Sequence, residues 1–122
     1  GREVDYRVVP WAVFTEPTLA SVGLTEEEAK QEGREVKVGL ADFSGSGRAK
    51  AIGLPIGRVK LVVDAGSDRL LGGHILGPHA DILIHQVVTA MYQNGTAESI
   101  AKSIHVHPTL SEVVKKAARG AR

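Results

Sequence analysis

Residues 105–112 read His105-Val106-His107-Pro108-Thr109-Leu110-Ser111-Glu112, and this stretch predicts where the last helix of the chain begins. A residue before proline is disfavoured in the helical region, so we expect extended backbone at His107. Thr109 and Glu112 have the T-x-x-E spacing of a capping box, which predicts a helix that starts at Thr109. Apolar residues then recur at helical spacing until Gly120. This apolar stripe consists of Leu110, Val113, Val114, Ala117 and Ala118.

The spacing of this stretch leaves three interpretations open. In the first, Glu112 only caps the helix and His107 is an ordinary surface histidine. In the second, His107 carries a proton and Glu112 orients its ring, as a base and its orienting group do in general acid–base catalysis. In the third, His105 and His107 bind a metal, because alternate residues of an extended segment share one face. The chain has no cysteine and no second tight cluster of ligands, which argues against a metal site.

The composition is that of one soluble globular domain. The chain has 122 residues, 43% of them hydrophobic and 24% charged, and a formal net charge of +1. Without a basic cluster, nucleic acid is not an expected partner. No apolar run approaches the roughly 20 residues of a membrane span, and the start does not resemble a signal peptide. We therefore expect a cytoplasmic protein that does not contact membranes and, lacking cysteine, performs no thiol redox chemistry by itself.

The first residues are typical of the end of a linker. Arg2, Glu3 and Asp5 are charged, and the chain begins with glycine. We expect residues 1–122 to form a single domain, of which residues 1–6 are the remnant of a linker. We also expect the chain to be part of a longer protein.

The first half of the chain predicts two strands and a helix. Residues 7–14 are rich in β-formers, but Pro10 cannot donate to a ladder, so we expect an edge or bulged strand. Thr25 and Glu28 form a capping box that predicts a short surface helix over 25–32. Val36, Val38 and Leu40 alternate with Lys37 and Gly39, which predicts a half-buried strand through Phe43 with these three residues on one face.

The glycine-rich stretch 44–57 predicts an exposed connection. Gly45 and Gly47 begin like a dinucleotide-binding fingerprint, but Lys50 stands where the third glycine is required, and no G-K-[ST] follows. We therefore expect no phosphate site here and interpret Arg48 and Lys50 as solvated charges.

The second half predicts a hairpin followed by helices. Residues 58–64 and 70–76 read as paired strands, and Gly72 and Gly73 indicate a bulge or a close backbone approach. Residues 81–94 predict the longest helix, with its apolar face towards the core and His85 on the other face. Thr96 can cap a further short helix. Strands in the middle and helices at the end indicate an α+β fold, an antiparallel sheet with helices packed on one side.

Five segments carry a family resemblance: VFTEP at 13–17, ASVGLTE at 20–26, GRA at 47–49, LGGHILG at 71–77 and HVHPTLSE at 105–112. In this order and spacing they closely resemble the C-terminal dimerisation (interface) domain of the FAD-dependent pyridine nucleotide–disulfide oxidoreductases. The resemblance covers nearly the whole chain. The form HVHPTLSE is most similar to the dihydrolipoamide dehydrogenases, with the glutathione reductases as close relatives.

The resemblance implies specific roles for three residues. In the family, the histidine before proline reaches across the dimer to the redox dithiol of the other subunit and acts as its acid–base. The glutamate five residues further on orients that histidine. These positions are His107 and Glu112, which makes them the expected catalytic residues. The family also has a cis peptide before this proline, with the histidine carbonyl near the partner's flavin, so His107 and Pro108 are the expected contacts to partner-subunit FAD.

The resemblance also implies partners and cofactors. It implies a homodimer that contacts the FAD and NAD domains of the same enzyme, with FAD and NAD(P) in the full-length protein. This chain alone is expected to bind neither cofactor and not to turn over, because the glycine fingerprint and the cysteine pair are missing from it. The alternative is a stand-alone homodimerisation module without catalytic activity. The disulfide substrate and the choice between NAD and NADP stay open.

Overall fold

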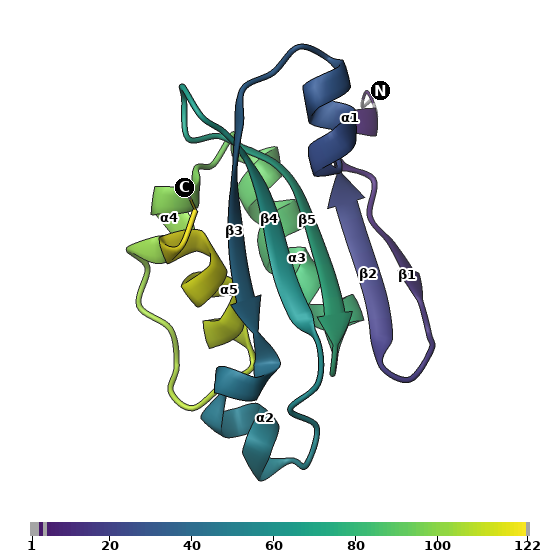
Figure 1. Cartoon of the computed structure of the whole chain (residues 1–122), viewed down its shortest axis with the longest axis vertical. Helices are drawn as coiled ribbons and strands as arrows, with labels where there is room; N and C mark the ends of the chain where they lie inside the picture. The colour runs from purple at the N-terminus through teal and green to yellow at the C-terminus, as the bar shows by residue number, and fades with distance from the viewer. Residues whose placement is uncertain (1–2, 4, 122) are drawn as a thin grey trace.

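The computed structural model describes residue 3 and residues 5–121, which form one antiparallel sheet and five α-helices. The strand order is β1-β2-β5-β4-β3 (Figure 1). The strands are β1 Trp11–Val13, β2 Thr18–Gly23, β3 Val36–Asp42, β4 Arg58–Asp64 and β5 Leu70–Gly77. The helices are α1 Glu26–Gln31, α2 Gly47–Ala51, α3 Ala80–Tyr92, α4 Ala97–Ala101 and α5 Ser111–Arg119. The predicted α+β class is confirmed.

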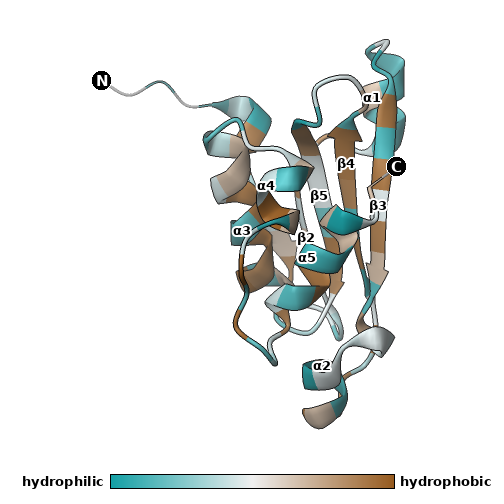
Figure 2. Cartoon of the chain, turned by 90° about the vertical axis from the view of Figure 1, so that its left-hand side faces the viewer, coloured by the Kyte–Doolittle hydropathy of each residue, from teal (hydrophilic) through white to brown (hydrophobic). Residues whose placement is uncertain are grey.

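Three helices, α3, α4 and α5, cover one face of the sheet (Figure 2). The core lies between these two layers. Full burial of a valine, leucine or isoleucine side chain contributes about 1.5–3 kcal/mol, so this layer is the main source of stability. Its fully buried side chains include Val59, Leu61, Val63 and Ile75 of β4 and β5, Val22 of β2, Val87 of α3 and Val114 of α5. The predicted apolar faces of α3 and α5 are thus confirmed.

Two glycines allow the helices to approach the sheet closely. A Cβ at Gly39 of β3 would overlap the carbonyl oxygen of Ala117 in α5. A Cβ at Gly73 of β5 would lie 2.8 Å from Cγ1 of Val87 in α3. The expected bulge is present as well, since the β4–β5 register shifts between Val62 and Val63. The extra residue of this bulge is Leu71, next to Gly72, and a Cβ at Gly72 would overlap the carbonyl oxygen of Leu24. The prediction of a bulge or a close backbone approach at Gly72 and Gly73 is thus confirmed.

The prediction for strand β3 is wrong about its buried face. Gly39 and Ala41 are buried beneath α5, whereas Leu40 is exposed and Val36 and Val38 are only half-buried. The alternation of apolar and polar residues predicts instead that Val36, Val38 and Leu40 form the buried face. The reason is that α5 needs a small residue beneath it, and glycine at position 39 supplies that space.

Three local predictions also need correction. Arg7 and Val8 belong to a 3-10 turn, η1 Tyr6–Val8, because the Asp5 carboxylate accepts from the Arg7 N–H and side chain. Within the predicted strand 7–14, only Trp11–Val13 is a strand, and it lies at an edge of the sheet. Strand β2 was not predicted. Stretch 44–57 is not wholly a loop, since it contains α2, which Ser46 caps, and the end of a 3-10 turn, η2 Phe43–Gly45.

Two predicted helix caps are confirmed. Thr25 and Glu28 make both hydrogen bonds of a capping box at α1. Thr96 caps α4, with Ser99 as its partner. The linker prediction for residues 1–6 falls partly on residues 1–2 and 4, which lie outside the described residues. No helix within the described part of the chain is long and apolar enough to cross a membrane.

The second face of the sheet is open over most of its area. Strand register places Trp11, Ser21, His74, Lys60 and Leu40 in one row across it. Helix α1 lies near one end of this face, where Glu26 pairs with Lys60 at 2.8 Å. Apolar side chains exposed on this face are Trp11, Val13, Leu40 and Leu76.

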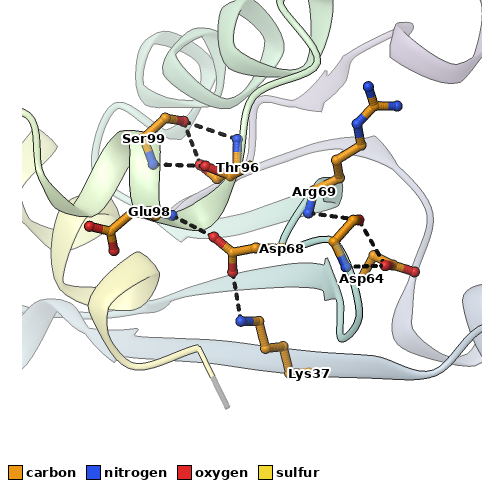
Figure 3. A network of polar contacts seen from close by, with 8 residues as sticks. Lys37, Asp64, Asp68, Arg69, Thr96, Glu98 and Ser99 are labelled. Atoms are coloured by element: carbon orange, nitrogen blue, oxygen red, sulfur yellow. Dashed lines mark hydrogen bonds and ion pairs between the residues drawn. The ribbon is translucent and has the colours of Figure 1, made fainter.

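A polar network joins the β4–β5 turn to β3 and α4 (Figure 3). Asp68 has a left-handed φ of 66°. Its carboxylate pairs with Lys37 at 2.6 Å and accepts from the Glu98 N–H at 2.9 Å. Burial raises the pKa of Asp68, but these two donors outweigh burial and lower it overall. The turn therefore determines where α4 begins.

Replacing Asp68 should loosen this junction. Asp68→Ala removes the acceptor of the Glu98 N–H and the partner of Lys37, so we expect a loss of about 1–3 kcal/mol in the free energy of unfolding. Urea denaturation of the chain measures this loss. The matched control is Glu98→Ala, whose own carboxylate makes no polar contact within the described part of the chain, and which should change stability by less than about 0.5 kcal/mol. Equal effects of the two substitutions would refute the role of the turn.

The close approach at Gly73 can be tested by a double-mutant cycle. Gly73→Ala should cost about 1–3 kcal/mol through overpacking against Val87. Because Val87→Ala makes room for the new methyl group, the double variant should cost less than the sum of the two single variants. Gly47→Ala is the control, since nothing lies within 4 Å of its Cβ position. Additive costs at Gly73 and Val87 would contradict the proposed contact.

Candidate functional site

The candidate site lies on the irregular segment 102–110 that links α4 to α5. In Figure 1 this segment is the yellow-green loop between the two helices. The His107–Pro108 peptide is cis, as predicted, and Glu16–Pro17 is also cis. The loop returns the chain to the sheet, where α5 packs against β3 and β4.

The predicted contact between His107 and Glu112 is present. Nδ1 of His107 lies 3.0 Å from each carboxylate oxygen of Glu112. Oε1 of Glu112 also accepts from the Thr109 N–H at 2.9 Å. The carboxylate therefore does both things that the sequence left open: it binds the backbone at the helix start and it orients the imidazole.

The predicted start of the last helix is wrong by two residues. The helix begins at Ser111, and Leu110 takes the N-cap position without a side-chain bond. The Glu112 N–H donates to the Thr109 carbonyl at 3.4 Å and not to the Thr109 hydroxyl, which itself donates to the Val106 carbonyl at 2.7 Å. Only the carboxylate half of the capping box is formed, and the hydroxyl instead ties Thr109 back to the loop.

This geometry determines the proton positions on the His107 ring. An ionised carboxylate only accepts hydrogen bonds, so a neutral His107 carries its proton on Nδ1 and a lone pair on Nε2. Nε2 has no hydrogen-bond partner among the described residues, and the side chain is 79% exposed. The Thr109 N–H and then the His107 ring lower the pKa of Glu112, which keeps the carboxylate ionised. The pair can take up a proton at an accessible nitrogen.

The second histidine of the motif has partners that sequence reasoning missed. Nε2 of His105 lies 2.6 Å from Nε2 of Gln86 on α3. Nδ1 of His105 lies 3.1 Å from the Ser103 carbonyl, which also accepts from Nζ of Lys115 at 2.7 Å. Since His105 and His107 have different partners, the structure gives no support to a shared metal. The described residues contain no group of three or more His, Cys, Asp or Glu that could hold one.

A hollow of about 400 Å³ opens beside the pair. It is lined by His107, Glu112, Lys116 and Arg119 together with the stretch 45–47. A larger hollow of about 610 Å³ lies between the N-terminal segment, α1 and α3, and it contains none of the predicted site residues. The smaller hollow is the candidate site, because the oriented imidazole lies there.

Comparison with known proteins identifies relatives along almost the whole chain. Residues 9–118 match the family model described as pyridine nucleotide-disulphide oxidoreductase, dimerisation domain. Mitochondrial dihydrolipoyl dehydrogenase 2 of Arabidopsis thaliana is 47% identical over 115 residues, which are 94% of this chain and 23% of that protein. Dihydrolipoyl dehydrogenase of Cupriavidus necator is 44% identical over 94% of this chain and 24% of that protein.

Solved structures show the same fold. LpdA from Mycobacterium tuberculosis superposes with a TM-score of 0.89 at 26% identity, over 97% of this chain and 26% of that one. The Cu(II) complex of the HOCl-induced flavoprotein disulfide reductase RclA from Escherichia coli superposes with a TM-score of 0.88 at 28% identity, over 93% of this chain and 26% of that one.

The chain spans about a quarter of the length of the relatives it matches. The match covers the whole sheet, the covering helices and the segment that carries His107 and Glu112. The chain belongs to the dimerisation-domain family of the pyridine nucleotide-disulphide oxidoreductases and is related to the dihydrolipoamide dehydrogenases.

Proposed function

We propose that this chain is the part of a flavin-dependent, NAD(P)-linked disulfide oxidoreductase of the dihydrolipoamide dehydrogenase type that supplies His107 and Glu112 to the redox dithiol of the partner subunit. The observation that carries the proposal is the oriented imidazole. Glu112 contacts Nδ1 of His107 with both oxygens at 3.0 Å, and Nε2 is left facing outward.

The chemistry that this pair would perform is a reversible proton transfer. Nε2 of His107 takes the proton of a dithiol S–H, and the thiolate that forms is the attacking nucleophile in disulfide exchange. The sulfur that leaves the substrate disulfide then receives the same proton back from Nε2. Glu112 stabilises the imidazolium between the two steps and keeps the ring in one orientation. The attacking sulfur is then joined to the other substrate sulfur in a mixed disulfide. The second thiol of the dithiol, deprotonated in the same way, attacks this mixed disulfide, closes the disulfide of the enzyme and releases the substrate sulfur, which takes up that proton.

The cofactors belong to other parts of the proposed enzyme. The family implies FAD, and NAD(P) supplies or accepts hydride in enzymes of this kind. The residues of this chain do not fit a resident dinucleotide site, because Gly45 ends a 3-10 turn and Gly47 begins a five-residue helix, with Lys50 in place of the third glycine. We propose only that the exposed His107–Pro108 peptide lies against the flavin of the partner subunit.

The exposed apolar residues support a homodimer and contacts with further domains. Ile104 is 98% exposed and Val106 is 76% exposed, and both flank the site. Trp11, Val13, Leu40 and Leu76 lie on the open face of the sheet. Such surface is typical of interaction sites. A stand-alone homodimerisation module would use the same surface, so the upstream reading frame decides between the two. A C-x4-C pair and a G-x-G-x-x-G there would favour the enzyme. The cytoplasmic location stays a prediction.

We expect the chain to form a two-fold homodimer, because closed two-fold pairing is the commonest assembly and buries the exposed apolar residues. Sedimentation equilibrium at high micromolar concentration should return twice the monomer mass. Ile104→Asp should shift the equilibrium towards monomer. Glu27→Gln on the outer side of α1 serves as the control and should leave it unchanged. A monomer at all concentrations would contradict the proposed association.

The catalytic role can be tested in a chimera. The matched segment of the Cupriavidus necator enzyme is replaced by this chain, and dihydrolipoamide-dependent reduction of NAD is measured together with flavin absorbance. His107→Gln should lower kcat by about 10²- to 10⁴-fold, the usual contribution of a positioned acid–base group, while flavin content stays the same. His85→Gln, an exposed histidine on the outer face of α3, should leave kcat unchanged. If the His107→Gln chimera keeps full activity, the proposed role is wrong.

A further inference from the structure

The segment that carries His107 is held in place by polar contacts rather than by burial. Residues 103–108 have no regular secondary structure. Ile104 and Val106 point outward, so apolar packing within this chain does not hold the segment. An irregular segment with two outward apolar residues has many alternative conformations, each of which would place the His107 ring elsewhere. Whatever selects one conformation therefore also positions the imidazole.

Contacts to the segment come from two helices, α3 and α5. From α3, Gln86 reaches the His105 ring at 2.6 Å. From α5, Lys115 donates to the Ser103 carbonyl at 2.7 Å. These two anchors hold the side of the loop that precedes His107, and Glu112 holds the side that follows it.

The His105 ring acts as a bridge within this arrangement. The Ser103 carbonyl only accepts, so Nδ1 of His105 carries the proton and donates to it. Nε2 then holds a lone pair, which accepts from the Gln86 amide. Both ring nitrogens are used, and neither is free for chemistry. This is the opposite of His107, whose Nε2 has no partner among residues 3 and 5–121.

From this geometry we infer that Gln86 and His105 form a positioning pair that sets the orientation of His107 from two residues away. The expected effect of this pair on catalysis rests on the proposed function. Its effect on the orientation of the His107 ring is a property of this chain alone. Gln86 and His105 act through His107, so they are positioning residues and not catalytic ones. A displacement of about 1 Å at a reacting group can lower a rate by about 10²-fold, which makes such an anchor consequential.

The first test uses the chain itself and needs no activity. Long-range ¹H–¹⁵N spectra of the imidazoles, recorded where the histidines are neutral, report which ring nitrogen carries the proton. In the wild-type chain His107 should show the Nδ1–H form imposed by Glu112. Gln86→Leu and His105→Leu should each cause a loss of this form, because the ring no longer stays over the carboxylate. Gln93→Leu, the matched glutamine at the end of α3, should leave the His107 signals unchanged.

The second test uses the chimera. Gln86→Leu should lower kcat by about tenfold or more, within the range that misplacement of a reacting group produces, with unchanged KM and flavin content. His105→Leu should do the same, and the double variant should be no worse than the more affected single variant, since both substitutions remove the same contact between His105 and Gln86. If Gln86→Leu fails to fold, Gln86→Ser, which is too short to reach His105, replaces it in both tests.

The outcomes separate this inference from the function on which it rests. If His107 keeps its Nδ1–H form in both Gln86→Leu and His105→Leu, the positioning pair is overturned, whatever the activity. If the form is lost while His107→Gln leaves the chimera fully active, the positioning pair stands and the proposed catalytic role fails. Additive losses of kcat in the double variant would show two independent effects and would also overturn the pair.

Discussion

The close packing of α3 and α5 against one face of the sheet is the constraint on which the rest of the structure depends. Gly39 and Gly73 leave no side chain between strand and helix, so the backbone of α5 and the valine of α3 lie directly on the sheet. The helices thereby bury the apolar face of β4 and β5. With both helices fixed, the short α4 and the loop that follows it must span the distance between their ends.

The site uses this rigid layer as its support. The His107–Glu112 pair is local, since five residues separate the two side chains and a single carboxylate holds both the imidazole and the Thr109 N–H. The placement of the pair is not local. It depends on Gln86 from α3 and Lys115 from α5, which hold the loop from two sides. The site therefore combines an exposed reactive nitrogen with a backbone anchored to the core layer.

Patterns with short-range causes were predictable from the sequence. The capping box at Thr25, the cap at Thr96, the apolar stripe of α3 and the 58–76 hairpin each depend on neighbours a few residues apart. The errors have long-range causes. Leu40 is exposed because α5 requires Gly39 beneath it. Strand β2 carries small residues with no clear alternation, and its pairing with β1 and β5 defines it as a strand.

The sequence by itself determined the class of fold and, through five segments in family order along nearly the whole chain, the family and the two residues of the candidate site. The contact between these two residues is local, because a histidine before proline and the first turn of the next helix lie next to each other in the chain. Only the tertiary structure decided the buried face of β3, the use of the Thr109 hydroxyl by the loop and the anchoring of His105 by Gln86. The physical reason is that these three features are set by groups on different elements, whose relative position follows from helix-on-sheet packing and not from any local preference of the chain.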